Sequence, residues 1–540
     1  MRHFEEKIAR KYKDFLIDNQ LKNHNYIEAA YRARKWISKN TIQNKGIVIT
    51  SKQRTIYQEV TGYYIPTLLQ WGMREEALKY THYLCNIQEE SGAWLDGTQQ
   101  RESVFNTGQV LRGLVVMIEI APEIRENLIK GCDWLISNID DNGRLVSTPG
   151  TVWSKSGINS ELIHLYCLPP LRDAGIILGK KEYLDAVERV KSFYISQYME
   201  DIENFNYLSH FYAYVLEALV DLGETELAAK AMKKIEKIQR IDGSVPAYKD
   251  CTWVCSTGLF QLAIVWFKLG NWDKGNKAFD YAVSLQNASG GWYGGYCSKI
   301  RLHNKTVKLH LLKETVSYFP DEEISWAVKY FFDALHYREN VEFENKASSF
   351  MDYISSDDGK FRVIYEQILE ESKKKDRALD VLDVGCGKGR YLKKLYLKDP
   401  SNSYRGVDIS HNVLKYLNNK NIKTGISSIL NINYPDNVLD VVFATESLEH
   451  AIFIDLAIKE MCRVLKPGGK LIIIDKDNDA FEEKRYVSWL DPKELSTKQW
   501  LDTKHTLQIL SKEGLTELET FYIPTGEGNM YRAFIGRKTI

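Results

Sequence analysis

The stretch Val381-Leu-Asp-Val-Gly-Cys-Gly-Lys-Gly-Arg390 decides the fold of the last third of this 540-residue chain. An apolar strand, residues 378–384, runs into a glycine-rich turn, and a helix is expected to begin near Tyr391. Glycines let a backbone approach a ligand closely, and the first turn of a helix offers free N–H groups. The pattern predicts a ligand-binding turn, although many nucleotide-binding folds use a G-x-G-x-G turn.

Further segments follow this turn in a definite order. A short strand ends in an acid at Asp408, a position where a carboxylate suits the hydroxyls of a ribose. The remaining segments are Pro435-Asp-Asn-Val-Leu-Asp-Val-Val-Phe443, Leu448-Glu-His450 and Leu465-Lys-Pro-Gly-Gly-Lys-Leu-Ile-Ile-Ile474. Their order narrows the choice among nucleotide-binding folds more than the glycine turn alone does.

Together these segments resemble the class I S-adenosylmethionine-dependent methyltransferases of the type 11 kind. The resemblance implies a Rossmann-like α/β domain with a seven-stranded sheet, and S-adenosyl-L-methionine as cofactor. A helix at 503–513 and strands at 516–523 and 531–538 look like the antiparallel final hairpin that this family adds to a parallel sheet. Residues 476–504 are expected to form a helical lid over the methyl acceptor.

The resemblance also implies roles for individual residues. The expected cofactor-binding residues are Asp383, Gly385, Gly387, Gly389, Asp408, Ile409, Ser428 and Ile429. Asp383 should anchor the methionine amino group, Asp408 the ribose hydroxyls and Ile409 the adenine. Ser428 stands where the family often has an Asp that contacts the adenine amino group, so this contact should be weaker here.

Methyl transfer also needs a nucleophile held against the sulfonium and, in some reactions, a proton acceptor. Glu446 and His450 are the candidate catalytic residues, because the resemblance places both at the mouth where acceptors dock. His450 has an alternative interpretation as a structural residue at the start of the following helix.

Composition restricts the remaining choices. The formal net charge is +0 and the pI about 7.1, which gives no electrostatic footprint for nucleic acid or an anionic membrane surface. No apolar run is long enough to span a membrane, and the amino terminus leads into a charged helix, so we expect a cytoplasmic protein. Cys251 and Cys255 lack a second ligand pair at zinc spacing, so no metal site is predicted.

An internal repeat organises the first two thirds of the chain. The best copies are Gln88-Glu-Glu-Ser-Gly92-Ala-Trp94 and Gln286-Asn-Ala-Ser-Gly290-Gly-Trp292, and each copy separates an amphipathic helix from a more apolar one. Helical hairpins of this kind, about 50 residues each, can close into a ring whose inner helices are buried on all sides. We therefore predict an all-α (α/α)6 toroid over residues 1–345 and a methyltransferase domain over residues 346–540.

This half resembles the toroids of the terpenoid cyclase and prenyltransferase superfamily and those of carbohydrate-active enzymes. The acid motif of the cyclases is absent, so the Gln-Gly-Trp repeat is interpreted as packing between hairpins. Tyr57, Glu59, Trp94 and Asp96 fall in loops expected at the ring opening, where aromatic rings beside carboxylates suit sugars. The two acids are expected to be exposed loop carboxylates.

These observations predict a methyltransferase acting on a small-molecule or glycan-type acceptor, which the toroid binds or processes. The expected pathway is polysaccharide biosynthesis. The alternative makes the toroid the main enzyme, a glycoside hydrolase, lyase or cyclase, with the methyltransferase domain as its accessory. A toroid that serves as a protein-binding platform is a third interpretation. No oligomeric state follows from the sequence.

Overall fold

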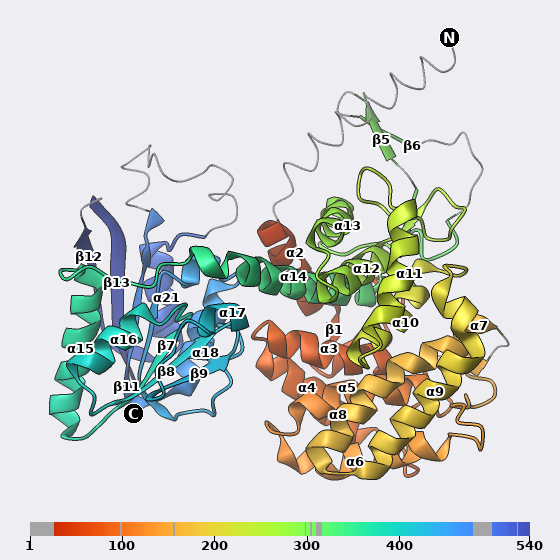
Figure 1. Cartoon of the computed structure of the whole chain (residues 1–540), viewed down its shortest axis with the longest axis horizontal. Helices are drawn as coiled ribbons and strands as arrows, with labels where there is room; N and C mark the ends of the chain where they lie inside the picture. Colours follow the sequence, from red (N-terminus) through yellow and green to blue (C-terminus); the bar gives the residue numbers. More distant parts are fainter. Residues whose placement is uncertain are drawn as a thin grey trace. The chain divides into compact units, whose positions relative to one another are not determined.

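The computed structural model describes residues 26–97, 100–154, 157–297, 299–302, 305–308, 316–478, 499–525 and 528–540. The chain divides into two compact units (Figure 1). The helical unit comprises Met1–Leu69 with Arg74–Arg338, and the α/β unit comprises Gln70–Met73 with Glu339–Ile540. The division falls within helix α14 (Ser325–Lys346), so the domain boundary predicted at 345/346 stays a prediction.

The helical unit is built from successive helices joined by short turns. Its longer helices are α2 (Tyr26–Asn40), α3 (Gln58–Gln70), α4 (Arg74–Asn86), α5 (Val104–Met117), α6 (Arg125–Ser137), α8 (Leu168–Leu178), α9 (Lys181–Glu203), α10 (Ser209–Asp221), α11 (Thr225–Ile238), α12 (Ser256–Lys268) and α13 (Trp272–Ser284). Amphipathic and apolar helices alternate as predicted. Helix α11 buries four of its fourteen residues, whereas α12 buries twelve of thirteen.

The Gln-Gly-Trp repeat packs hairpins together, which confirms its interpretation from sequence. The side-chain amide of Gln88 donates to the carbonyl of Gly92 in its own turn and to that of Asn127 on α6, each at 2.9 Å. Gln286 repeats this arrangement and reaches the carbonyl of Ala29 on α2 at 2.9 Å. The tryptophans of both copies are fully buried, and each donates its indole N–H to a helix carbonyl at 2.8 Å.

The α/β unit contains a seven-stranded sheet in the order β12-β13-β11-β10-β7-β8-β9. Its strands are β7 (Asp380–Val384), β8 (Ser403–Asp408), β9 (Ile422–Ile426), β10 (Leu439–Thr445), β11 (Leu465–Lys476), β12 (Leu515–Thr525) and β13 (Gly528–Lys538). Strands β11, β10, β7, β8 and β9 pair in parallel, while β13 pairs antiparallel with both β11 and β12. This topology confirms the predicted Rossmann-like sheet and its antiparallel final hairpin.

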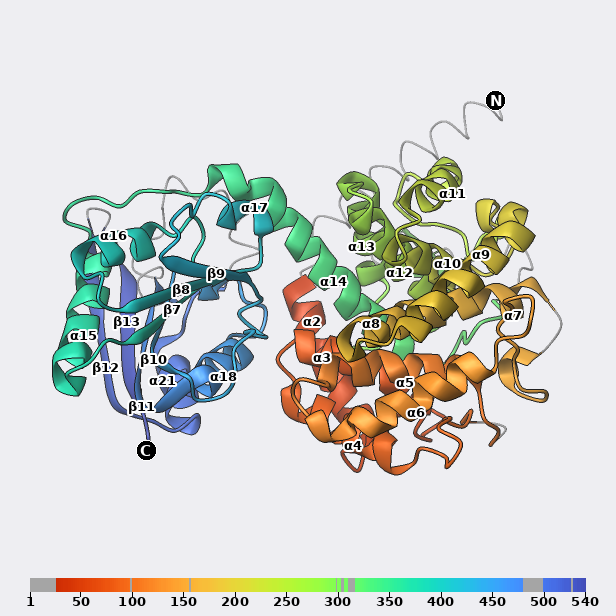
Figure 2. The same cartoon turned by 60° about the horizontal axis from the view of Figure 1, so that its bottom comes forward.

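Helices cover both faces of this sheet, because neighbouring residues along each strand point to opposite sides. Val381 belongs to a core with α15 (Gly359–Lys375) and α16 (Arg390–Lys398). Leu382 belongs to the opposite core with α18 (Ile454–Val464) and α21 (Thr503–Lys512) (Figure 2). Burial on both faces explains the nearly continuous apolar runs of β7 and β10.

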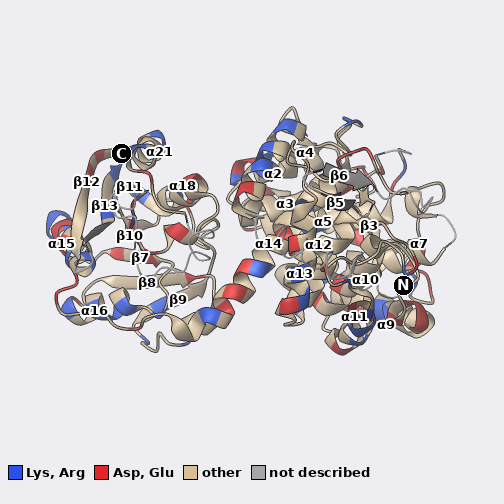
Figure 3. Cartoon of the chain, turned by 90° about the horizontal axis from the view of Figure 1, so that it is seen from above, with Lys and Arg blue, Asp and Glu red and all other residues tan. Residues whose placement is uncertain are grey.

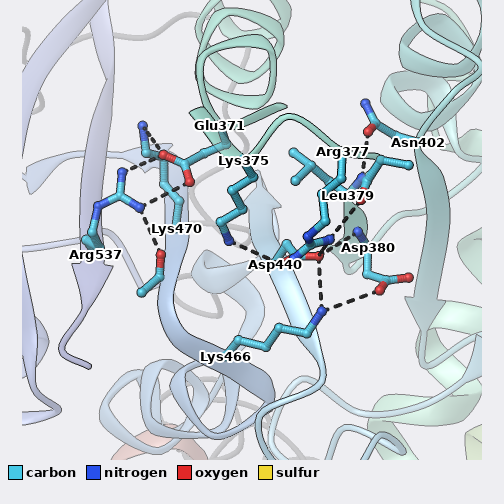
Figure 4. A network of polar contacts seen from close by, with 12 residues as sticks. Glu371, Lys375, Arg377, Leu379, Asp380, Asn402, Asp440, Lys466, Lys470 and Arg537 are labelled. Atoms are coloured by element: carbon cyan, nitrogen blue, oxygen red, sulfur yellow. Dashed lines mark hydrogen bonds and ion pairs between the residues drawn. The ribbon is translucent and has the colours of Figure 1, made fainter. Parts of the chain in front are cut away.

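The amino ends of β7 and β10 carry a dense network of ion pairs (Figure 4). Asp440 is completely buried, and its carboxylate accepts hydrogen bonds from Arg377, Lys375 and Lys466. Beside it, the buried Glu371 of α15 pairs with Arg537 at 2.5 Å. These cations lower the pKa of both carboxyl groups against the opposing effect of burial.

Charged residues of both signs are interspersed over each unit (Figure 3), in agreement with the zero formal net charge. Across the described ranges, no helix combines the length and apolar character needed to cross a membrane.

Candidate cofactor site

A cavity of about 510 Å³ lies at the carboxyl ends of β7, β8 and β10 in the α/β unit. It brings together most of the predicted site residues, which come from the carboxyl ends of β7 and β8, from the glycine turn and from the segments that follow β8, β9 and β10. The predicted residues in its walls are Asp383, Gly385, Gly387, Asp408, Ile409, Ser428, Ile429, Glu446 and His450. Open parallel sheets bind ligands at this edge, where loops from neighbouring strands meet.

The glycine turn has the left-handed backbone that its sequence implies. Gly385 has φ +74°, and a Cβ there would lie 2.5 Å from the Cβ of Ser447. Gly389 is not part of the cavity wall. It caps α16 with φ +72°, and a Cβ there would lie 2.1 Å from Leu417, so packing accounts for this glycine. Its predicted cofactor contact stays a prediction.

Asp383 presents a buried oxygen with no partner at the cavity. The residue is 2% exposed, and burial raises the pKa of its carboxyl well above the ordinary range. Within the described part of the chain, its Oδ2 accepts no hydrogen bond, and the hydroxyl oxygens of Thr445 and Tyr391 are likewise unpartnered. All three residues line the cavity. Buried polar atoms in proteins almost always have partners, so these three indicate a polar ligand.

Asp408 connects the ends of β7 and β8. Its Oδ2 accepts from the backbone N–H of Gly387 at 2.9 Å, and its Oδ1 accepts from the N–H of Ser410 at 3.0 Å. Burial raises the pKa of this carboxyl, and the hydrogen bonds oppose that rise. The acid is therefore held rigidly at the cavity wall.

Glu446 is held in a cluster of cations at the other end of the cavity. Arg390 donates to its carboxylate, Tyr531 donates to Oε1 at 2.5 Å, and the Nζ of Lys360 lies 3.4 Å from Oε1. Burial opposes ionisation, but Lys360 and Arg390 lower the pKa of Glu446 to about 2. A carboxylate with these partners is a weak proton acceptor at neutral pH.

His450 lies beside a buried carboxylate on the same wall. Its Nε2 is 3.5 Å from the Oε1 of Glu449, whose Oε2 accepts from the Nζ of Lys476 at 2.7 Å. The imidazole packs edge-on against Phe343, with ring centroids 5.4 Å apart. His450 ends the short 3-10 helix η5 (Leu448–His450), and α18 begins only at Ile454. The structure thus does not place it at the start of the following helix.

The helical unit holds the other predicted substrate residues, and their burial differs from expectation. Trp94 is fully buried in the hairpin packing. Glu59 and Asp96, expected as exposed loop acids, are 6% and 1% exposed. Glu59 lies in the first turn of α3, hydrogen-bonded to Tyr57, and burial raises its pKa to about 8. The prediction of exposure was wrong. Glu59 belongs to α3, which buries ten of its thirteen residues, and the carboxylate of Asp96 accepts from the backbone N–H of Val152 at 3.3 Å.

Sequence reasoning missed part of the cavity wall. Residues 339–351, here called the wall segment, contribute Glu339, Phe343, Phe350 and Met351. Lys476 and Tyr531 contribute from β11 and β13. No local motif marks the wall segment, since it precedes the first strand of the sheet. Most of the predicted lid lies outside the described residues, which resume at Gln499.

Comparison with known proteins shows that most residues of this cavity lie in a recognised domain. Residues 382–473 match the family described as methyltransferase domain. An uncharacterized protein of Methanocaldococcus jannaschii, MJ1123, is 30% identical over 162 residues, which is 29% of this chain and 74% of that protein.

Other relatives match over shorter parts. The ubiquinone/menaquinone biosynthesis C-methyltransferase UbiE of Saccharophagus degradans is 32% identical over 117 residues, 20% of this chain and 47% of that protein. The chain thus spans less than half of that relative's length. A solved S-adenosylmethionine-dependent methyltransferase from Mesorhizobium loti is 16% identical, with a TM-score of 0.28, over 33% of this chain and 98% of that one.

The residues of the cavity fit S-adenosylmethionine. Asp383 offers an unpartnered carboxylate oxygen for an ammonium group, and the hydroxyls of Thr445 and Tyr391 lack partners in the described structure. The backbone at Gly385 and Gly387 adopts a left-handed conformation that brings the turn close to a ligand. An acid at the end of β8 completes the set of groups that this cofactor needs.

Proposed function

We propose an acceptor class and a set of residue roles for this chain, which belongs to the S-adenosylmethionine-dependent methyltransferases and uses S-adenosylmethionine as its cofactor. When bound, the cofactor supplies an electrophilic methyl group. Asp383 anchors its amino group, Asp408 accepts from its ribose hydroxyls, and Ile409 packs against its adenine. The unpartnered oxygen of Asp383 and the position of Asp408 at the end of β8 support these roles.

The acceptor in this proposal is a small molecule with an apolar ring or chain that bears an ionisable group. The wall segment offers two aromatic rings and a thioether at the cavity, and Leu430, Ala451 and Ile452 add apolar surface. Such a wall suits an apolar ligand, whereas a glycan would need more hydrogen-bonding groups. Relatives named for quinone and hydroquinone methylation support the same class.

His450 is the general base in this proposal. Its pairing with the buried Glu449 is the observation that carries the assignment, since a carboxylate orients an imidazole and stabilises its protonated form. Glu446, by contrast, is already engaged by Arg390 and Tyr531, so it maintains the shape of the site. The base takes a proton from an oxygen, or from a carbon activated by one, as that atom accepts the methyl group.

The test uses the full chain, isotopically labelled S-adenosylmethionine and a panel of phenols and hydroquinones. The wild type should label at least one of them. His450→Gln should lower kcat by about 10²–10⁴ while calorimetry gives an unchanged affinity for S-adenosylhomocysteine. His505→Gln, on the exposed side of α21, is the matched control and should retain full activity. Full activity in His450→Gln would remove the base assignment, and no labelled product from the panel would remove the acceptor class.

For the helical unit we propose closure into the predicted (α/α)6 ring. The contact between Gln286 and Ala29 supports it, because it joins the last copy of the repeat to α2, the first helix that the structure describes. The hydroxyl of Tyr64 on α3 donates to the carbonyl of Ser325 on α14, which is a second contact of this kind. The glycan-type acceptor at Tyr57, Glu59, Trp94 and Asp96 stays a prediction. So does the alternative in which this unit is the main enzyme.

A further inference from the structure

The wall segment forms one side of the cofactor cavity although it precedes the first strand of the sheet. Phe343 and Phe350 stack at a centroid distance of 6.3 Å and an angle of 19°, and both line the cavity. The Nζ of Lys388, in the glycine turn, donates to the carbonyl of Ser348 at 2.9 Å. The segment is therefore bonded directly to the turn that should hold the cofactor.

Glu344 makes the most extensive contact of the wall segment. Its Oε1 accepts from the backbone N–H of His411 at 2.7 Å. Its Oε2 accepts from the N–H of Asn412 and from the hydroxyl of Ser410, both at 2.9 Å. Three donors, the hydroxyl of Ser410 and the first two backbone N–H groups of helix α17, thus converge on one carboxylate that is itself outside the cavity wall.

Ser410 links this carboxylate to Asp408. Its hydroxyl donates to Glu344, while its backbone N–H donates to the Oδ1 of Asp408 at 3.0 Å. The loop between β8 and the short helix α17 (His411–Leu414) is consequently fixed at both ends. Two carboxylates near each other would repel, and Glu344 contributes to the raised pKa of Asp408 after burial. Glu344 therefore acts on Asp408 in two ways, through the hydrogen bonds of Ser410 and through electrostatic repulsion.

We propose that Glu344 is a positioning residue for cofactor binding. It holds the loop after β8 so that Asp408 faces the ribose hydroxyls, and it fixes the wall segment against the same loop. The proposal deepens the proposed function and rests on it. It also implies that the functional cofactor domain begins before residue 345, at Glu339 or earlier.

The experiment measures S-adenosylhomocysteine binding to the full chain by calorimetry. Glu344→Gln should weaken binding about tenfold, because the amide cannot accept three hydrogen bonds as a carboxylate does. Glu342→Gln is the matched control two residues earlier, where the side chain pairs with Lys346 at 2.7 Å. It should bind with wild-type affinity.

A second ligand separates positioning from a general effect on folding. The 2′-deoxyribose counterpart of S-adenosylhomocysteine lacks one of the ribose hydroxyls from which Asp408 should accept a hydrogen bond. The wild type should prefer the normal ligand clearly, and Glu344→Gln should lose most of that preference. An equal loss for both ligands would overturn the proposal, as would unchanged affinity in Glu344→Gln.

Two further outcomes complete the design. If Glu344→Gln does not fold, Ser410→Ala removes the hydroxyl that bonds to Glu344. This variant should show the same loss of preference for the ligand with both ribose hydroxyls. An unchanged preference would overturn the proposal. If the wild type binds neither ligand, the proposed function itself fails, and that result is distinguishable from failure of the Glu344 assignment.

Discussion

The two ends of the α/β sheet carry the same residue type in opposite states. At the amino ends, Asp440 is buried among Arg377, Lys375 and Lys466, and these cations lower the pKa of its carboxyl. At the carboxyl ends, Asp383 is equally buried, but one oxygen has no partner in the described structure and burial raises its pKa. Removing one member of a buried ion pair is costly, so the partners of Asp440 serve the fold. A buried acid with an unpartnered oxygen reduces the stability of the fold until a ligand supplies the missing partner.

This difference distinguishes acids that stabilise the fold from acids that bind a ligand, without reference to any relative. Both ends are rich in charge, so charge density alone does not locate a site. The distinguishing property is whether the hydrogen-bonding capacity of each buried acid is already used. By this criterion the network of Figure 4 is structural, and the cavity beside Asp383 is functional.

The largest expected effect is at the amino ends. Asp440→Asn should lower the free energy of unfolding by about 3–5 kcal/mol, because it leaves buried cations without their partner. Urea denaturation of the full chain measures it through the transition of the α/β unit. Asp436→Asn is the control, because the side chain of Asp436 is 56% exposed. It should lower the free energy of unfolding by less than about 1 kcal/mol. Equal small effects would mean that the network does not stabilise the fold.

The same network predicts a pH dependence. The pKa values of Asp440 and Glu371 are lowered in the folded protein, so their contribution is fully present above the unfolded pKa of an acid. It should be lost as the pH falls from about 5 toward the folded values. Asp440→Asn should flatten this acid limb of the stability profile.

The next effect concerns binding at the carboxyl ends. Asp408→Ala removes the acceptor for the ribose hydroxyls and should weaken S-adenosylmethionine binding by about 2–4 kcal/mol. Calorimetry measures the affinity, and far-UV circular dichroism checks that the fold is retained. Unchanged affinity would contradict the ribose assignment while leaving the fold comparison intact.

Much of the cofactor site was predictable from sequence because its parts are local. The glycine turn directly follows β7, Asp408 is the last residue of β8, and His450 lies in η5 shortly after β10. Strand ends of this kind can be recognised from short patterns. The topology then brings them together. Gly389 shows the limit of such reasoning. The glycine pattern places it in the turn but does not reveal that it packs against Leu417 and does not line the cavity.

The remainder depends on contacts between residues far apart in the chain. Glu344 meets Ser410 across 66 residues, and Glu446 meets Tyr531 across 85, so neither pairing has a local signature. Burial of Glu59, which is 6% exposed in the first turn of α3, has no local signature either. Sequence patterns predicted which residues are near the site but not which are already partnered.

The most direct test of the account is the unfolding free energy of Asp383→Asn at neutral pH, with and without S-adenosylmethionine. Because the pKa of Asp383 is raised, the acid reduces folded stability as pH rises above its unfolded pKa. Without cofactor the variant should therefore be more stable than the wild type, by about 1 kcal/mol, and added cofactor should stabilise it less than the wild type. A cofactor-free variant of lower stability, or equal stabilisation of both proteins by the cofactor, would contradict the account.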